Sequence, residues 1–272
     1  MSFKFSSTFS SSRRRFLRQA SVAGFAVPAG ALRSRLAFAA PVNEPPRIYV
    51  DSRRTIGELQ RTVFGSFIEH LGRAIYDGIF EPGSALADAR GFRTDVLSAV
   101  RRLGVPLIRG PGGSFLSQYD WLDGVGPVEQ RPRVLDEAWN TIETNRFGTD
   151  EFMAWCKAAG AEVLMTVDLG SGTPEKAAAL VEYCNFSGGT RWSDLRRRNG
   201  HSQPYNVRYW GLGNELDGPW EIGQMSAEKY GWKAADAARR MRAVDPSIFL
   251  TACGSSWTGL PTYLEWDREV LE

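Results

Sequence analysis

The sequence predicts an α/β fold with parallel strands, and three observations support this. A chain of 272 residues that is 43% hydrophobic and 24% charged has the composition of a globular protein. Apolar runs alternate with amphipathic stretches, as in parallel strands joined by helical crossovers. Each run ends in polar residues, which suits a barrel or a doubly wound sheet, because both carry their sites at the carboxyl ends of the strands.

The strands are expected where short apolar runs occur between turns. In chain order they are an isolated strand at 47–50, then strands at 62–68, 105–108, 162–167, 206–212 and 247–252. Two long connections separate some of them, at 110–145 and 185–204, and we expect both to be loops. The first holds Tyr119, Trp121 and Trp139, which argues against disorder.

The helices are expected where apolar residues recur every three or four positions. They are 92–103, 147–159, 174–183, 226–244 and a stretch beginning near 263. Thr173 before Pro174 is a typical start of a helix, and Ser226 is a suitable N-cap for the fourth helix.

The first 39 residues predict an export signal. A basic run, 12–18, precedes a weakly apolar stretch, 20–32, and the small residues around Phe38. The paired arginines are similar to a twin-arginine signal, so we expect a periplasmic or extracellular protein. The apolar stretch is shorter than the roughly 20 residues that cross a bilayer, so we expect no stable membrane anchor. A disordered basic tail is the alternative.

Charge and cysteine usage exclude other classes. Residues 1–39 carry seven basic and no acidic side chains, so the rest of the chain has a net charge of −5 and we expect no nucleic acid partner. Cys156, Cys184 and Cys253 lie in apolar contexts and are expected to be small buried hydrophobes. With only His70 and His201 available, we expect no metal and no cofactor.

Five polar residues follow the predicted strands and are expected to meet on one face: Glu69, Arg109, Asp168, Asn214 and Glu215. Each has a structural alternative. Glu69 could form an ion pair at a strand end, Arg109 could pair with Glu69 or Asp168, and Asp168 could cap the next helix.

Asn214 and Glu215 have the chemistry of a glycoside hydrolase site. Such a site needs a carboxylic acid that protonates the leaving oxygen and a neutral group that binds a neighbouring sugar hydroxyl. Adjacent side chains diverge on a regular strand, so both can face a substrate only if the backbone breaks, which Gly213 would allow. A dinucleotide loop at 211–213 is disfavoured because it lacks the third glycine.

The nine tryptophans also suit a sugar site, because aromatic faces pack on the apolar faces of sugar rings. Trp121, Trp139 and Trp220 lie in loops and are the candidates. Trp155 and Trp232 lie in predicted helices and are expected in the core.

Several motifs resemble family 51 glycoside hydrolases, the bacterial α-L-arabinofuranosidases, from about Arg47 to Glu272. They are 65–76, 81–84, 109–113, 123–127, 131–133, 210–220 and 253–256. The resemblance implies a (β/α)8 TIM barrel with a separate β-sandwich, and retaining hydrolysis of terminal arabinofuranose. It implies that Glu215 is the general acid/base, that Asn214 binds the sugar 2-hydroxyl, and that Glu69 and Arg109 belong to the arabinose subsite.

The sequence departs from the usual family pattern at three positions. Gly110 stands where the family usually has Tyr, Ser114 where it has a sugar-binding Asn, and Asp168 where Asn is common. Ser114 can still bind substrate with a hydrogen bond, but it reaches less far than Asn.

The retaining mechanism also needs a nucleophilic carboxylate, which the family carries on its seventh barrel strand. Apart from the isolated strand at 47–50, we count five strands before Glu272 and therefore expect the nucleophile to be absent from this chain. Glu265, Glu269 and Glu272 look like a solvated helix face.

The sequence thus predicts three segments: a signal at 1–39, an N-terminal strand or linker at 40–60, and a partial TIM barrel at 61–272 of about five βα units, without the C-terminal strands and the β-sandwich. The expected function is removal of terminal non-reducing α-L-arabinofuranosyl residues from polysaccharides or oligosaccharides, with this chain alone inactive. The alternatives are a non-catalytic sugar-binding remnant or another retaining barrel glycosidase, a β-xylosidase or endoglucanase. A homo-oligomer of the full-length protein is also considered.

Overall fold

The computed structural model describes residues 48–272 and divides them into two units, 48–56 and 57–272. The predicted export signal lies outside the described residues. In the first unit, 48–56 contain no helix or strand, and every residue is exposed. The isolated strand expected at 47–50 is therefore wrong for 48–50, because these apolar residues have no partner strand and no core to cover.

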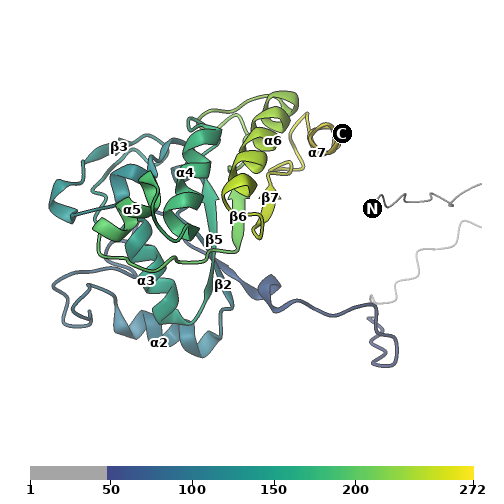
Figure 1. The fold of residues 1–272 in the computed structure, drawn as a ribbon. Coiled ribbons are helices and arrows are strands. Elements are labelled where there is room, and N and C mark those ends of the chain that lie inside the picture. Colours follow the sequence, from purple (N-terminus) through teal and green to yellow (C-terminus); the bar gives the residue numbers. More distant parts are fainter. Residues whose placement is uncertain (1–47) are drawn as a thin grey trace, which may run out of the picture. The chain divides into compact units, whose positions relative to one another are not determined.

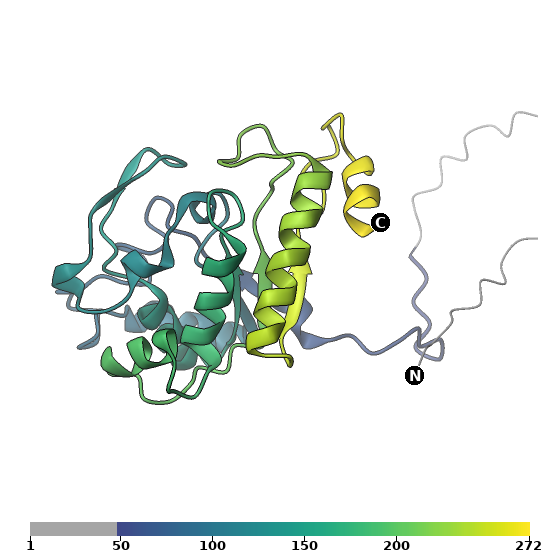
Figure 2. The same cartoon turned by 45° about the horizontal axis from the view of Figure 1, so that its top comes forward.

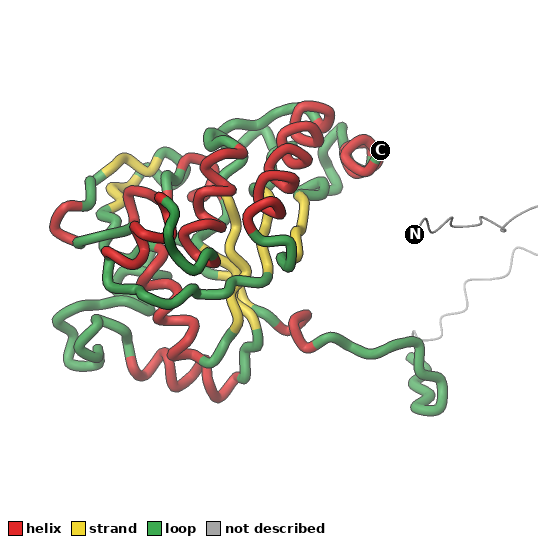
Figure 3. Tube along the Cα trace, viewed as in Figure 1, coloured by secondary structure: helices red, strands yellow, loops and turns green. Residues whose placement is uncertain are grey.

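The second unit is built on a five-stranded parallel sheet (Figures 1 and 3). Its strands are β1 (Ser66–Phe67), β2 (Leu107–Gly110), β5 (Glu162–Val167), β6 (Tyr209–Leu212) and β7 (Phe249–Ala252). They neighbour one another strictly in chain order, β1-β2-β5-β6-β7, and every pair is parallel. A doubly wound sheet reverses its order at a switch point, whereas a barrel wall does not. The described sheet is thus part of a (β/α)8 barrel, as predicted.

The crossover helices are α2 (Thr94–Leu103), α3 (Thr149–Ala159), α4 (Pro174–Asn185) and α6 (Ala227–Val244), followed after β7 by α7 (Glu265–Leu271). α4 and α6 lie side by side (Figures 1 and 2). Both predicted N-caps are confirmed. Thr173 Oγ1 accepts a hydrogen bond from Lys176 N at 3.2 Å, and Ser226 Oγ accepts one from Lys229 N at 3.3 Å.

The expected strand at 62–68 is mostly wrong. Residues Arg61–Phe64 form a 3-10 helix, and only Ser66–Phe67 pair with β2. The long connection at 110–145 is more ordered than a loop. It contains 3-10 helices at Ser114–Gln118, Trp121–Gly124 and Val128–Gln130, and an antiparallel hairpin of β3 (Val134–Asp136) and β4 (Thr141–Glu143). We call the segment 134–143 the hairpin.

The loop expected at 185–204 is also wrong, because it contains a further helix, α5 (Arg191–Arg198). Arg196 on this helix is completely buried, and its Nη1 donates to the carbonyl oxygens of Tyr183 and Phe186, both at 2.7 Å. Backbone carbonyls at the end of α4 thus satisfy a buried guanidinium, which makes a strongly polar sequence part of the packed structure.

The core lies around β2, β5 and β6, whereas the sheet's outer strands are exposed. Phe67 on β1 and Phe249 on β7 are about half exposed. Cys156 and Cys184 are fully buried and Cys253 is half-buried, and all three are free thiols. None of the helices in residues 48–272 is long and apolar enough to cross a membrane.

Trp155 is buried as predicted, but Trp232 is 75% exposed, so its assignment to the core is wrong. α6 turns Trp232 outward, although the helix as a whole is amphipathic.

Candidate functional site

The carboxyl ends of β2, β5 and β6 bring one set of predicted residues together. Arg109 on β2 donates from Nε to Thr166 Oγ1 on β5 at 3.2 Å, and from Nη2 to Asn214 Oδ1 beyond β6 at 2.8 Å. Arg109 therefore reaches across one strand and fixes a side chain on the next. Its guanidinium also lies over the Phe67 ring, 5.0 Å from the ring centre.

Arg109 is the positive centre of a mostly acidic site. Burial lowers the pKa of Arg109, while the neighbouring Cys253, Glu69, Glu215 and Glu221 oppose that shift. A guanidinium remains charged under such conditions. Its charge therefore compensates the carboxylates that surround it.

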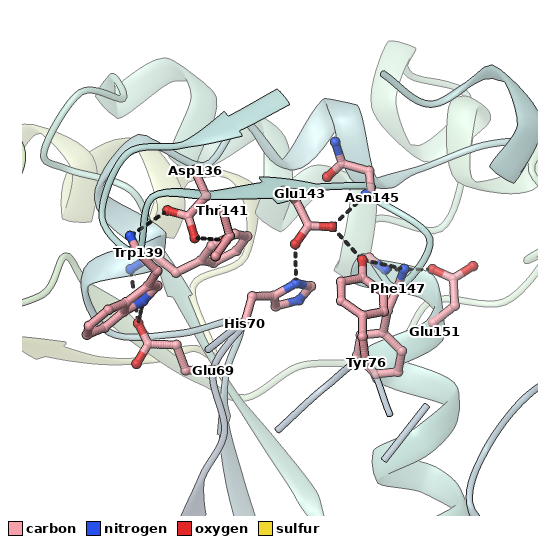
Figure 4. A network of polar contacts seen from close by, with 12 residues as sticks. Glu69, His70, Tyr76, Asp136, Trp139, Thr141, Glu143, Asn145, Phe147 and Glu151 are labelled. Carbon is pink, nitrogen blue, oxygen red and sulfur yellow. Dashed lines mark hydrogen bonds and ion pairs between the residues drawn. The ribbon is translucent and has the colours of Figure 1, made fainter. Parts of the chain in front are cut away.

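Glu69 is buried, and two donors hold its Oε1. The backbone N of Phe115 donates at 3.0 Å. Trp139 Nε1 on the hairpin donates at 3.1 Å, as Figure 4 shows. The backbone passes so close that a Cβ at Gly112 would lie 3.0 Å from Glu69 Cγ. Glu69 is thus bound to the loop after β2 and to the hairpin.

Asn214 and Glu215 follow β6 through the backbone break that the sequence predicts. Gly213 has φ +85° and Glu215 φ +45°, both in the left-handed region. A Cβ at Gly213 would also lie 2.9 Å from Leu216 Cδ1, so only glycine fits here without strain. The half-buried Glu215 accepts a hydrogen bond at Oε2 from Trp220 Nε1, at 2.9 Å.

Sequence analysis missed Glu221, which is buried beside Asn214. Its Oε1 accepts from Ser117 Oγ at 2.5 Å and from Asn214 Nδ2 at 3.2 Å, and its Oε2 accepts from Ser114 Oγ at 2.8 Å. Glu221 does not directly follow a strand but lies further along the loop after β6. The signal that could have found it is an acid placed between this strand and the next helix.

Asp168 does not join the set, so the expectation that all five polar strand ends meet is wrong in this case. Its Oδ1 accepts from Gly170 N at 2.7 Å and its Oδ2 from Ser171 Oγ at 2.8 Å. Asp168 therefore stabilises the turn that leads into α4. This role is close to the alternative that Asp168 caps the next helix. Burial raises the pKa of Asp168.

The tryptophan candidates divide in the same way. Trp121 is buried, packs on the Tyr183 ring at 5.3 Å and donates from Nε1 to Lys176 O, so its assignment to a sugar site is wrong. Trp139 and Trp220 are exposed beside Glu69 and Glu215. At the family departure Gly110, a Cβ would lie 2.7 Å from Phe152 Cζ, so the Phe152 ring occupies the space of a side chain.

A buried network anchors the hairpin (Figure 4). Glu143 Oε2 lies 2.7 Å from His70 Nδ1, while its Oε1 accepts from Tyr76 Oη and from Asn145 N. The His70 ring stacks on Phe115, with ring centres 4.4 Å apart. Phe115 N also binds Glu69. The network therefore stabilises the segment after β2 that holds Glu69. Within residues 48–272, no cluster of His, Cys, Asp and Glu could hold a metal ion.

A parallel α/β barrel with an Asn–Glu pair at the carboxyl end of a strand defines the class of barrel glycoside hydrolases. The model of one family, described as the alpha-L-arabinofuranosidase 1 domain, matches residues 99–267. The chain belongs to this family of arabinofuranosidases, glycoside hydrolase family 51.

Relatives agree in sequence and in structure. The intracellular exo-alpha-(1->5)-L-arabinofuranosidase 1 of Bacillus subtilis is 55% identical over 226 residues, which are 83% of this chain and 45% of that protein. The solved family 51 enzyme of Bifidobacterium longum has a TM-score of 0.76 at 44% identity, covering 78% of this chain and 42% of that one. That of Thermotoga petrophila gives 0.76 at 46%, covering 80% and 44%. The chain thus spans less than half the length of these relatives.

The comparisons contradict the expected export. The relatives from Bacillus subtilis, Halalkalibacterium halodurans, Acetivibrio thermocellus and Streptomyces lividans are all named intracellular enzymes. The prediction of a periplasmic or extracellular protein is therefore wrong. It rested on the order of basic, apolar and small residues in 1–39, which lie outside the described residues.

Proposed function

We propose that this chain carries the acid/base part of an α-L-arabinofuranosidase site that removes terminal non-reducing α-L-arabinofuranosyl residues from polysaccharides or oligosaccharides. One observation carries the proposal: Asn214 and Glu215 lie beside Arg109 at the carboxyl ends of the strands in a member of this family. The relatives' names support the substrate, since they are exo-arabinofuranosidases of (1->5) and (1->6) linkages.

In this proposal, Glu215 protonates the leaving oxygen and then activates water as a base. Its neighbour Trp220, which donates to Glu215, is about half exposed. Asn214 binds the sugar 2-hydroxyl, and Glu69, Arg109 and Ser114 complete the arabinose subsite.

Retention of configuration requires a second carboxylate about 5–5.5 Å from the acid. Among residues 48–272 we assign no side chain to that role, and Glu265, Glu269 and Glu272 at the end of the chain are exposed. We therefore expect the 272-residue polypeptide, produced alone, to bind the sugar without releasing p-nitrophenol from an aryl arabinofuranoside. A homo-oligomer of the full-length protein has no support among the relatives or the described residues.

The role of Glu215 is tested by leaving-group dependence in the product of the reading frame, including any codons after codon 272. Replacing Glu215 by Ala should lower kcat/KM about 100- to 10,000-fold for methyl arabinofuranoside, whose leaving group needs a proton. The loss should be far smaller for a dinitrophenyl arabinofuranoside, whose leaving group departs unprotonated. Equal losses for both substrates would refute the assignment.

A further inference from the structure

Glu221 binds three donors, and the proposed function assigns two of them, Ser114 and Asn214, to the arabinose subsite. Its two oxygens accept hydrogen bonds from Ser114, Ser117 and Asn214, and its side chain is buried. An ionised carboxylate only accepts hydrogen bonds, so it fixes the direction of every bond that it makes.

This direction decides how the Asn214 amide is turned. Its Oδ1 receives the Arg109 Nη2 donor, and its Nδ2 donates to Glu221. The flipped amide would place NH2 against a guanidinium and a carbonyl oxygen against a carboxylate, and neither pair can form a hydrogen bond. Arg109 and Glu221 therefore hold one orientation, in which the second Nδ2 hydrogen stays free.

The same carboxylate fixes the Ser114 hydroxyl. Since its hydrogen points to Glu221 Oε2, Ser114 Oγ can present only lone pairs to any other partner. Asn214 and Ser114 bind the two oxygens of one carboxylate, so the amide and the hydroxyl both lie beside Glu221. A sugar hydroxyl that lies between them would accept from the free amide hydrogen of Asn214 and donate to a lone pair of Ser114 Oγ.

We propose that Glu221 is the positioning residue that sets this donor–acceptor pair and thereby makes the site select for a sugar that carries a 2-hydroxyl. The inference rests on the proposed function, because it assigns the pocket to arabinofuranose. It also explains how Ser114 serves where the family usually has Asn: the shorter side chain acts as an acceptor that a buried acid orients.

The test measures dissociation constants of methyl α-L-arabinofuranoside and its 2-deoxy analogue for the 272-residue chain, by titration calorimetry. We expect the wild type to prefer the hydroxylated sugar at least about tenfold, as for one or two well-formed hydrogen bonds. In Glu221→Gln, whose amide both donates and accepts, that ratio should fall to about two- or threefold.

The matched control is Asp150→Asn. Asp150 is also a buried carboxylate that accepts hydroxyl hydrogen bonds, from Tyr183 Oη at 2.8 Å and Tyr205 Oη at 2.7 Å, but it lies on α3 away from the site. Its variant should keep the wild-type ratio even if it melts at a lower temperature. A purely structural effect would weaken both ligands alike and leave the ratio unchanged.

If Glu221→Gln does not fold, Ser117→Ala gives the answer, because it removes one donor and lets the Glu221 carboxylate shift. It should lower the ratio about threefold, a partial loss of one hydrogen bond. An unchanged ratio in the folded variant overturns the role of Glu221 while leaving the proposed function intact. A wild type that binds neither sugar overturns the proposed function itself, and this inference with it.

Discussion

The Arg109 guanidinium donates to Asn214 Oδ1 over 2.8 Å, although β2 and β6 are not neighbours in the sheet. The intervening strand β5 supplies Thr166, whose Oγ1 accepts a second bond from the same side chain. One residue thus joins three strands and holds the side chain that we assign to the sugar 2-hydroxyl.

Replacing Arg109 by Lys should disrupt this link while keeping the charge. A single ammonium cannot reach two acceptors with the geometry of the planar guanidinium. We expect a loss of about 1–3 kcal/mol in the free energy of unfolding in urea, and weaker binding of methyl arabinofuranoside. A Lys variant with the stability and affinity of the wild type would show that the link is dispensable.

Replacing Trp139 by Phe should weaken sugar binding with little effect on stability. The change removes the Nε1 donor to Glu69, yet Trp139 is 37% exposed and contributes little to the core. We expect about a tenfold rise in the dissociation constant. The control is Trp232→Phe on the outside of α6, which should change neither quantity. Equal effects in the two variants would contradict a role for Trp139 in the site.

Replacing Gly213 by Ala should be more damaging than the same change at Gly104. Both glycines have positive φ, +85° and +70°, so both variants incur about 1–2 kcal/mol of backbone strain. Only at Gly213 does the new Cβ meet a neighbour, Leu216 Cδ1 at 2.9 Å, whereas nothing lies within 4 Å at Gly104. Thermal melting should therefore show a larger loss for Gly213→Ala, and only this variant should lose sugar binding. Equal losses would mean that the break before Asn214 tolerates a side chain.

The buried Glu143 should make the protein acid-sensitive. Burial raises its pKa, but hydrogen bonds from His70, Tyr76 and Asn145 outweigh burial and hold the pKa below the ordinary value of 4.5. The unfolded chain then binds a proton more readily than the folded one. The stabilisation is present above about pH 4.5 and is lost as the pH falls through the lower folded pKa.

We therefore expect the free energy of unfolding of the wild type to fall more steeply with decreasing pH in this range than that of Glu143→Gln. The variant should be less stable near neutral pH, because the His70 contact changes. Parallel pH profiles would show that Glu143 titrates alike in both states.

Much of the barrel could be predicted because its strands are continuous apolar runs and its helices have clear caps, as at Thr173 and Ser226. β1 and α5 could not, for physical reasons. β1 is too short to show a period, and α5 is held by buried contacts of Arg196 with backbone carbonyls, which no pattern of apolar residues reveals.

The meeting of Arg109 and Asn214 was predictable, because both lie at the carboxyl ends of apolar strands. The same rule failed for Asp168, because a carboxylate at that place can bind its own turn instead. It missed Glu221, which lies seven positions after Asn214. The loop after β6 folds back so that the two side chains meet. The conformation of a loop, unlike the direction of a strand, cannot be inferred from a simple pattern in the sequence.

The most direct test of the proposed site is the binding of methyl α-L-arabinofuranoside to the 15N-labelled chain, compared with methyl β-D-xylopyranoside and methyl β-D-glucopyranoside. We expect saturable shifts with the arabinofuranoside only, centred on the backbone amides of Asn214, Glu215 and Phe115, which surround Arg109 and Glu69. No binding, equal binding of the three sugars, or shifts confined to residues away from these strand ends would contradict the assignment of an arabinofuranose site.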